Sequence, residues 1–106
     1  MSGHLIVYKN RTNKITVSLG IDVSADTITS EIRVGKDVST DLIATWNVAF
    51  LTDGTDGELV LTLDDSDTEN IAHRGGYMDI KRLSGGEPLV THLDPIPVVI
   101  QGVVTA

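Results

Sequence analysis

The stretch that decides the fold is residues 14–34, KITVSLGIDVSADTITSEIRV, in which an apolar residue occupies almost every second position. The alternation runs without interruption from Ile15 to Val23. It resumes after a polar break at residues 24–26, and the apolar positions that we expect to face inward there are Ile28, Ile32 and Val34. A period of two is typical of strands that bury one face and expose the other. The stretch therefore predicts two half-buried antiparallel strands.

The same alternation recurs along most of the chain. We expect further strands at residues 5–8, 44–50, 59–63, 77–82, 89–93 and 98–105. Trp46 and Phe50 fall on the same face of one of them, and we interpret that face as the centre of the core. Two Asp-Gly pairs in residues 52–57 are a strong hairpin signal between the strands that flank them.

Residues 64–73 break the alternation. Ser66 followed by Glu69 fits a capping box, so we expect one short helical turn near 66–72. Strands spaced in this way, with no helix long enough for a crossover between parallel strands, predict an all-β sandwich or barrel of seven to eight antiparallel strands. We expect a single domain over residues 1–106, with residues 1–13 as a peripheral strand and turn.

Composition excludes several classes of function. The formal net charge is −7, and the eight basic residues are scattered along the chain, so we expect no nucleic-acid partner. The chain has no cysteine, which leaves neither disulfides nor thiolate metal sites. No apolar run is long enough for a signal peptide or a membrane span, so we expect a protein made in the cytosol, with no membrane insertion.

Residue types that carry chemistry are present but do not form a motif. His4, His73 and His92 lie in three separate segments, without a second ligand at metal-binding spacing. The acidic run 64–69 lacks the glycine and the final glutamate of a calcium loop, and a capped helical turn explains its charges. Asp53 and Asp56 are the residue types that tight turns require. We therefore expect no catalytic residues, no metal site and no cofactor.

Aromatic residues allow two interpretations. Tyr8, Trp46, Phe50 and Tyr77 could form a platform for a ligand such as a sugar. The chain has only four aromatic residues, which favours using Trp46 and Phe50 in the core and the tyrosines at its rim.

An ordered set of segments resembles a known family. The set comprises residues 22–25, 28–33, 42–48, 57–63, 67–71, 76–81, 85–86 and 102–105. Its most specific element is the strand entry Gly76-Tyr-Met-Asp-Ile80 after a short helical turn. With these segments the chain resembles small immunoglobulin-like β-sandwich structural proteins of tailed bacteriophages and prophages, which are similar to the N-terminal module of some upper baseplate proteins.

The resemblance implies a non-catalytic virion module, of the tail or baseplate, that is assembled in the host cytoplasm and contacts other phage structural proteins or copies of itself. Edge strands of a sandwich can accept a partner strand unless they are protected. Two apolar strands, one near each end of the chain, are the expected interface, and its residues are Leu5, Ile6, Val7, Tyr8, Val99 and Val103. The competing interpretation is that both strands only close the sandwich of one chain. The alternative function is a carbohydrate-binding sandwich that recognises a host surface glycan.

Overall fold

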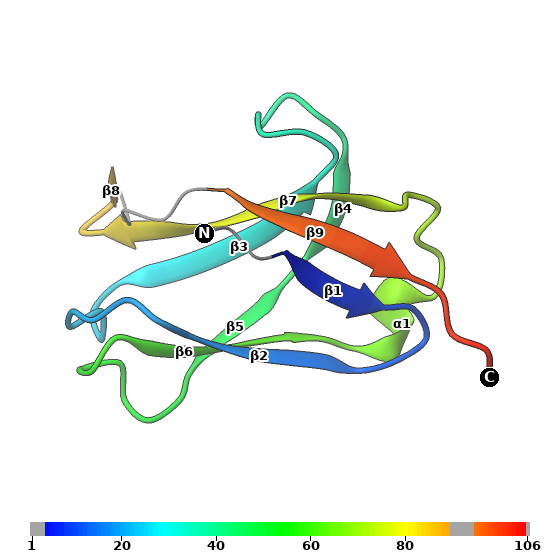
Figure 1. Ribbon diagram of the computed structural model, residues 1–106. Helices are drawn as coiled ribbons and strands as arrows, with labels where there is room; N and C mark the ends of the chain where they lie inside the picture. Colours follow the sequence, from blue (N-terminus) through cyan, green and yellow to red (C-terminus); the bar gives the residue numbers. More distant parts are fainter. Residues whose placement is uncertain (1–3, 90–94, 106) are drawn as a thin grey trace.

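The structure is a computed structural model that describes residues 4–89 and 95–105. These residues form two β-sheets stacked face to face, with one short helix at one end of the stack (Figure 1). The predicted all-β sandwich is confirmed. Its described part contains nine strands, because residues 42–50 form two strands and the hairpin after Ser84 adds a short one.

The larger sheet has six strands. Its order is β1 (Leu5–Tyr8), β9 (Ile96–Gln101), β7 (Gly75–Ser84), β3 (Thr27–Arg33) and β4 (Leu42–Thr45), and β8 (Glu87–Leu89) pairs with the far half of β7. The smaller sheet has the order β2 (Asn13–Ser18), β6 (Glu58–Leu63) and β5 (Asn47–Phe50). The helix α1 (Asp65–Thr68) links β6 to β7.

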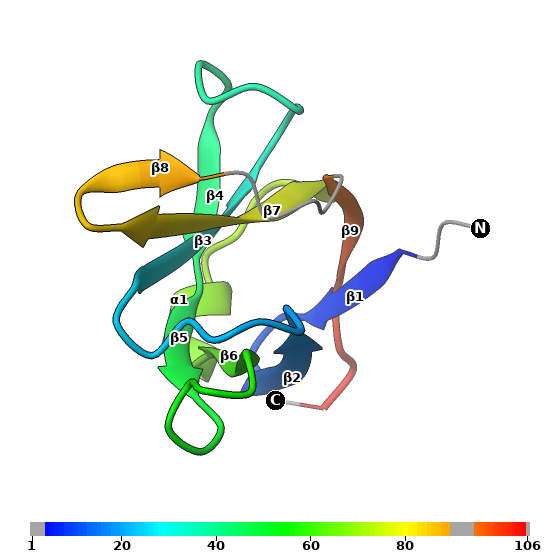
Figure 2. The same cartoon turned by 90° about the vertical axis from the view of Figure 1, so that its left-hand side faces the viewer.

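The strand connections are those of an immunoglobulin-like sandwich. The smaller sheet takes β2, β5 and β6, and the larger sheet takes the other strands, so the chain changes sheets after β1, β2, β4 and β6. β4 extends the larger sheet beyond β3 as an extra strand does in variable-type domains. Among the described strands, β1 and β9 form the one parallel pair, and the other pairs are antiparallel. Figure 2, which looks along the layers, shows β2 and β5 on opposite sides of β6.

The core lies between the inner faces of the two sheets. β6, the central strand of the smaller sheet, contributes three completely buried leucines, Leu59, Leu61 and Leu63. The prediction that these leucines face inward is confirmed. From the larger sheet, Val7, Ile32, Met78 and Ile100 pack into the same cluster. Alternation along each strand places these residues on one face, which is why the sequence pattern predicts them well.

Residues 42–50 do not form the single strand that their alternation predicts. Figure 1 shows the segment passing from β4 in the larger sheet to β5 in the smaller one. The residue between these two strands is Trp46. The Trp46 N–H donates to the Ser30 carbonyl at 2.9 Å, so the crossing residue still pairs with β3. Trp46 as a whole is only 3% exposed, which confirms it as a core residue, whereas Phe50 is half-buried.

β2, the strand predicted from the alternation that begins at Ile15, ends earlier than that pattern predicts. The alternation reaches Val23, but β2 stops at Ser18, and Gly20 has a positive φ of 71° that turns the chain out of the sheet. Ile21 is consequently 48% exposed, although Val23 re-enters the core. Val34 is also exposed rather than inward, because β3 ends at Arg33 and the chain leaves the sheet there.

The helical turn is capped by a different pair of residues from the predicted one. The helix begins at Asp65, so Ser66 lies inside its first turn and cannot be the N-cap. The Asp64 N–H donates to the Asp67 carboxylate at 2.9 Å, which is the reciprocal contact of a capping box. The predicted box of Ser66 and Glu69 is therefore wrong by two residues.

The ends of the last predicted strands also differ. β9 runs from Ile96 to Gln101, so Val103 lies beyond it. Glu87–Leu89 already form β8, and the remainder of the predicted strand 89–93 lies outside the described residues, together with His92.

An ion pair joins the start of β3 to the end of β7. Arg82 Nε donates to the Asp26 carboxylate, and the side chain of Asp26 is only 5% exposed. The hydrogen bond from Arg82, with a second from Ser84, lowers the pKa of Asp26 below its usual value of 3.8. The pair therefore contributes stability only while Asp26 is ionised.

Gly76 is a position where the fold requires glycine. A Cβ there would lie 2.1 Å from the carbonyl oxygen of Arg33 on the neighbouring strand. We expect Gly76→Ala to lower the free energy of unfolding by about 1–3 kcal/mol in urea denaturation, because the sheet must shift to admit the methyl group. Gly102→Ala is the control, since nothing lies within 4 Å of its Cβ. Equal stabilities of the two variants would contradict the close approach.

Asp26→Asn tests the ion pair through the dependence of stability on pH. The pKa of Asp26 is lower in the folded state, so its contribution is present above about pH 4 and is lost as the pH falls through the folded pKa. We expect the free energy of unfolding of the wild type to decrease more steeply below pH 4 than that of Asp26→Asn. Asp41→Asn, which removes an exposed loop carboxylate, controls for the change in net charge. Parallel curves for wild type and Asp26→Asn would contradict this role.

Candidate functional site

Three apolar side chains meet on the outer face of β1 and β9. Ile6 lies opposite Val99 in the parallel register, and Tyr8 follows Ile6 on the same face. Tyr8 is 41% exposed and Val99 is 39% exposed. On its other side Val99 neighbours Gly75 of β7, which has no side chain to cover it. We call Ile6, Tyr8 and Val99 the β1–β9 patch.

The structure separates the six residues predicted for the interface. Ile6, Tyr8 and Val99 form the patch. Val7 is completely buried in the core and Leu5 packs against it, so neither side chain is available to a partner in the way that the prediction requires. Val103 lies past the end of β9 and is half-buried. The four consecutive apolar residues of β1 thus divide between the core and the surface.

The edge of β1 is closed by a side chain that the sequence analysis did not single out. Asn13 accepts a hydrogen bond from the Tyr8 N–H through Oδ1, at 2.9 Å, and donates from Nδ2 to the Tyr8 carbonyl at 2.9 Å. Its amide therefore bonds to both backbone groups of Tyr8, as a neighbouring strand would. The Lys9 N–H donates to the Gln101 carbonyl of β9. Because successive residues of a strand direct their backbone groups to opposite sides, the N–H and C=O of Tyr8 point away from β9. A partner at this place can contact side chains more easily than backbone.

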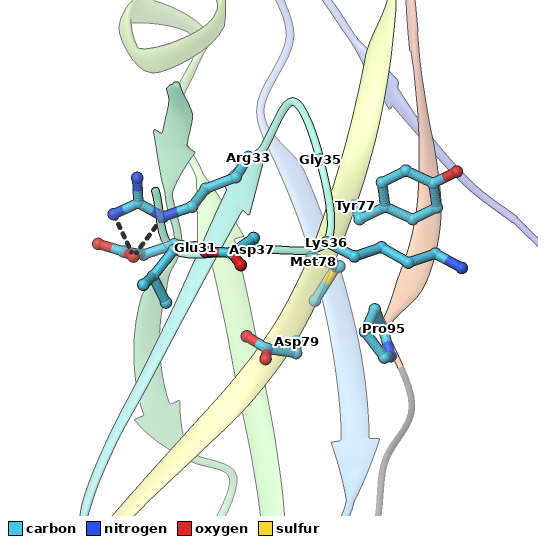
Figure 3. Close-up of a pocket in the computed structure, with 10 residues that line it drawn as sticks. Glu31, Arg33, Gly35, Lys36, Asp37, Tyr77, Met78, Asp79 and Pro95 are labelled. Carbon is cyan, nitrogen blue, oxygen red and sulfur yellow. Dashed lines mark hydrogen bonds and ion pairs between the residues drawn. The ribbon is translucent and has the colours of Figure 1, made fainter. Parts of the chain in front are cut away.

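A second surface feature is a pocket of about 70 Å³ where the loop 34–41 arches over the outer face of β3 and β7 (Figure 3). Its walls include Glu31, Arg33, Lys36, Tyr77 and Asp79. Sequence reasoning missed it because no motif links these strand and loop positions.

Most polar groups of this pocket are already engaged. Arg33 donates to the Glu31 carboxylate at 3.0 and 3.2 Å and to the Thr40 carbonyl at 2.8 Å. The ammonium of Lys36 lies 5.0 Å from the centre of the Tyr77 ring, within the range of a cation–π contact. Figure 3 shows the two side chains lying alongside each other. The loop is held by the chain's own contacts, and the ring that a ligand could stack on already contacts a cation.

Loop carboxylates are occupied by turn hydrogen bonds. Asp53 accepts from the N–H and the hydroxyl of Thr55, at 3.0 and 2.6 Å, and Asp56 accepts from the Glu58 N–H at 3.0 Å. The bonds from Thr55 lower the pKa of Asp53. These contacts confirm the prediction that the Asp-Gly residues serve turn chemistry.

Histidines and carboxylates do not converge in the described part of the chain. His4 and His73 are exposed and lie in separate segments. Within residues 4–89 and 95–105, no group of three or more histidine, aspartate or glutamate side chains is arranged to hold a metal ion. The described helix is also too short and too polar to cross a membrane.

Comparison with models of known protein families finds no match, and comparison with functionally characterised proteins finds no significant similarity. Function must therefore be argued from the surface of the chain itself.

Asn13→Ala tests the closure of the β1 edge. We expect it to lower the free energy of unfolding by about 0.5–1.5 kcal/mol, because the exposed backbone groups of Tyr8 and the Arg11 carbonyl must exchange their bonds to Asn13 for bonds to water. Urea denaturation followed by circular dichroism measures the change. Asn47→Ala, at an exposed position of β5, should change stability by less than about 0.5 kcal/mol. A neutral Asn13→Ala would show that the amide does not hold the edge.

Proposed function

We propose that the chain is a non-catalytic structural module of a bacteriophage or prophage virion, of the tail or baseplate, that acts through protein–protein contacts. The β1–β9 patch is the observation that supports a contact role, because it places three apolar side chains together on the outside of the sandwich. The segments from residue 22 to residue 105 that resemble phage β-sandwich proteins support the virion setting. The partners are other phage structural proteins, and the site of assembly is the host cytoplasm.

The inner faces of both sheets are committed to the core, so a partner has the outer faces and the edges to bind. At the β1–β9 patch the backbone of Tyr8 is bonded to Asn13, which favours recognition through side chains. Aromatic and aliphatic side chains that lose their contact with water are the usual anchors of such interfaces. Tyr8 offers both an apolar ring and a hydroxyl at the rim.

A glycan-binding role is the second candidate, and the pocket beside Tyr77 is the observation that favours it. The pocket lining includes an aromatic ring and the carboxylates of Glu31 and Asp79, which are group types that sugar-binding sites use. However, Lys36 contacts the ring, and each nitrogen of the Arg33 guanidinium already donates one hydrogen bond. Trp46, the largest aromatic residue, is buried in the core. The contact role is therefore the better supported of the two.

Val99→Glu tests the proposed function in the particle. Virions are induced from the lysogen that encodes the chain, purified, and analysed by quantitative mass spectrometry. We expect the wild-type chain to be a component of the particle and Val99→Glu to be depleted at least about tenfold, because a charge at the centre of the patch must lose water to bind.

Val38→Glu is the matched control. Val38 is 83% exposed at the tip of the loop 34–41, far along the sheet order from β1, so the same change of charge should leave incorporation intact. Absence of the wild-type chain from purified virions would contradict the virion setting. Normal incorporation of Val99→Glu would contradict the use of the patch.

A further inference from the structure

The edges of the two sheets are not equally protected. An edge strand presents unpaired N–H and C=O groups, and proteins usually guard such strands with charged residues, prolines, bulges or covering groups. The strands with an open side are β1, β4 and β8 in the larger sheet and β2 and β5 in the smaller one.

Four of these strands carry a recognisable guard. Asn13 covers the backbone of Tyr8 in β1. The register of β4 against β3 shifts between Ile32 and Arg33, which interrupts the edge of β4. β8 is three residues long and contains Glu87 and Pro88. The open side of β2 carries Lys14.

Within residues 4–89 and 95–105, β5 has no such guard. It reads Asn-Val-Ala-Phe and belongs to residues 42–52, which contain no charged residue and no proline. The Leu51 N–H bonds to the Glu58 carbonyl at 3.0 Å, so alternation along the pair directs the backbone groups of Asn47 and Ala49 toward β6. The N–H and C=O groups of Val48 and Phe50 therefore point away from the sheet.

We propose that β5 pairs with β5 of a second copy of this chain in antiparallel register, with the two-fold axis at Ala49. This inference concerns a different surface from the β1–β9 patch, and it does not depend on the virion setting. Centred there, Val48 of one copy lies opposite Phe50 of the other, and each pair exchanges two hydrogen bonds between its outward backbone groups. Four new hydrogen bonds join the two smaller sheets into one.

The side chains suit this register. Ala49 would face its own copy in a pair that is not hydrogen-bonded, where the Cα atoms approach to about 4.5 Å and the small alanine side chains fit without crowding. Leu51, which is 50% exposed, would lie opposite Asn47, and the half-buried Val48 and Phe50 would gain cover along the open side of the sandwich. A two-fold symmetric contact uses the same surface on both copies, so that surface must be complementary to itself. An uncharged strand edge that pairs antiparallel meets this requirement, because its outward N–H and C=O groups bond to those of the second copy.

Charge favours this edge for self-association. Each copy has a formal net charge of −7, so two copies repel each other over most of their surface. Residues 47–50 contain no charged side chain, so a contact between two β5 strands does not place like charges opposite each other. The contact is small, so we expect a dimer that depends on concentration and is favoured by salt, which screens the repulsion between the two chains.

Analytical ultracentrifugation of the full chain, from micromolar to millimolar concentration, tests the pairing. We expect a monomer–dimer equilibrium in the wild type and an increase of at least about tenfold in its dissociation constant in Ala49→Lys, since two lysines would then face each other at the axis. Ala49 is exposed in the monomer, and circular dichroism checks that the variant folds.

Two comparisons make the test specific. Thr16→Lys places the same charge on the edge of β2 and should leave the dimer intact. An equimolar mixture of Ala49→Lys and Ala49→Glu should associate at least as well as the wild type, because opposite charges then meet at the axis. A wild type that stays monomeric at millimolar concentration, an Ala49→Lys that dimerises normally, or a mixture that fails to associate would overturn the proposal.

Discussion

Burial of β6 between its two neighbours and beneath the larger sheet is the constraint on which the rest of the structure depends. Its three leucines are completely removed from solvent, and each contributes roughly 1.5–3 kcal/mol of hydrophobic stabilisation. The strand also fixes the register of β2 on one side and of β5 on the other. A chain without cysteines has no disulfide to replace this packing. Side chains on the inner faces of the two sheets therefore stabilise the fold and are not accessible to a partner.

The path of the chain around this core determines which strands lie at the edges of the two sheets. β1 enters beside β9 and is covered by the amide of Asn13, whereas the segment 42–50 crosses between the sheets at Trp46 and forms an edge of each. The crossing places an uncharged strand, β5, at the border of the smaller sheet. At the β1 edge the backbone of Tyr8 is thus bonded to a side chain, whereas the outward backbone groups of β5 remain available.

The sequence predicts the fold class and most of the core because alternation reports directly on the face of a strand. It places Trp46 and the leucines of β6 correctly. It fails where alternation continues past the end of a strand, as at Ile21, because a positive φ at Gly20 redirects the chain without changing the pattern. It also reads residues 42–50 as one strand, since alternation cannot show that a strand changes sheets. Asp64 and Asp67 cap the helix instead of the predicted pair, because acidic residues at neighbouring positions fit the same motif.

The candidate surfaces are harder to predict from sequence. Ile6, Tyr8 and Val99 are found by their apolar character, but only the register of β1 against β9 separates them from the buried Val7. The closure by Asn13 depends on a side chain that reaches across a turn, and no local pattern marks it. Predicting the open edge of β5 requires the topology of both sheets, since a strand is an edge strand only when no other strand pairs with one of its sides.

Amide hydrogen exchange of the dilute wild-type protein, resolved by residue with NMR, tests most directly the claim that the two sides of the sandwich differ. The account predicts slow exchange for Ala49, which bonds to β6, and for Tyr8, which bonds to Asn13. It predicts fast exchange for Val48 and Phe50, whose N–H groups point into solvent in the monomer. Protected amides at Val48 and Phe50 together with a rapidly exchanging Tyr8 would contradict it.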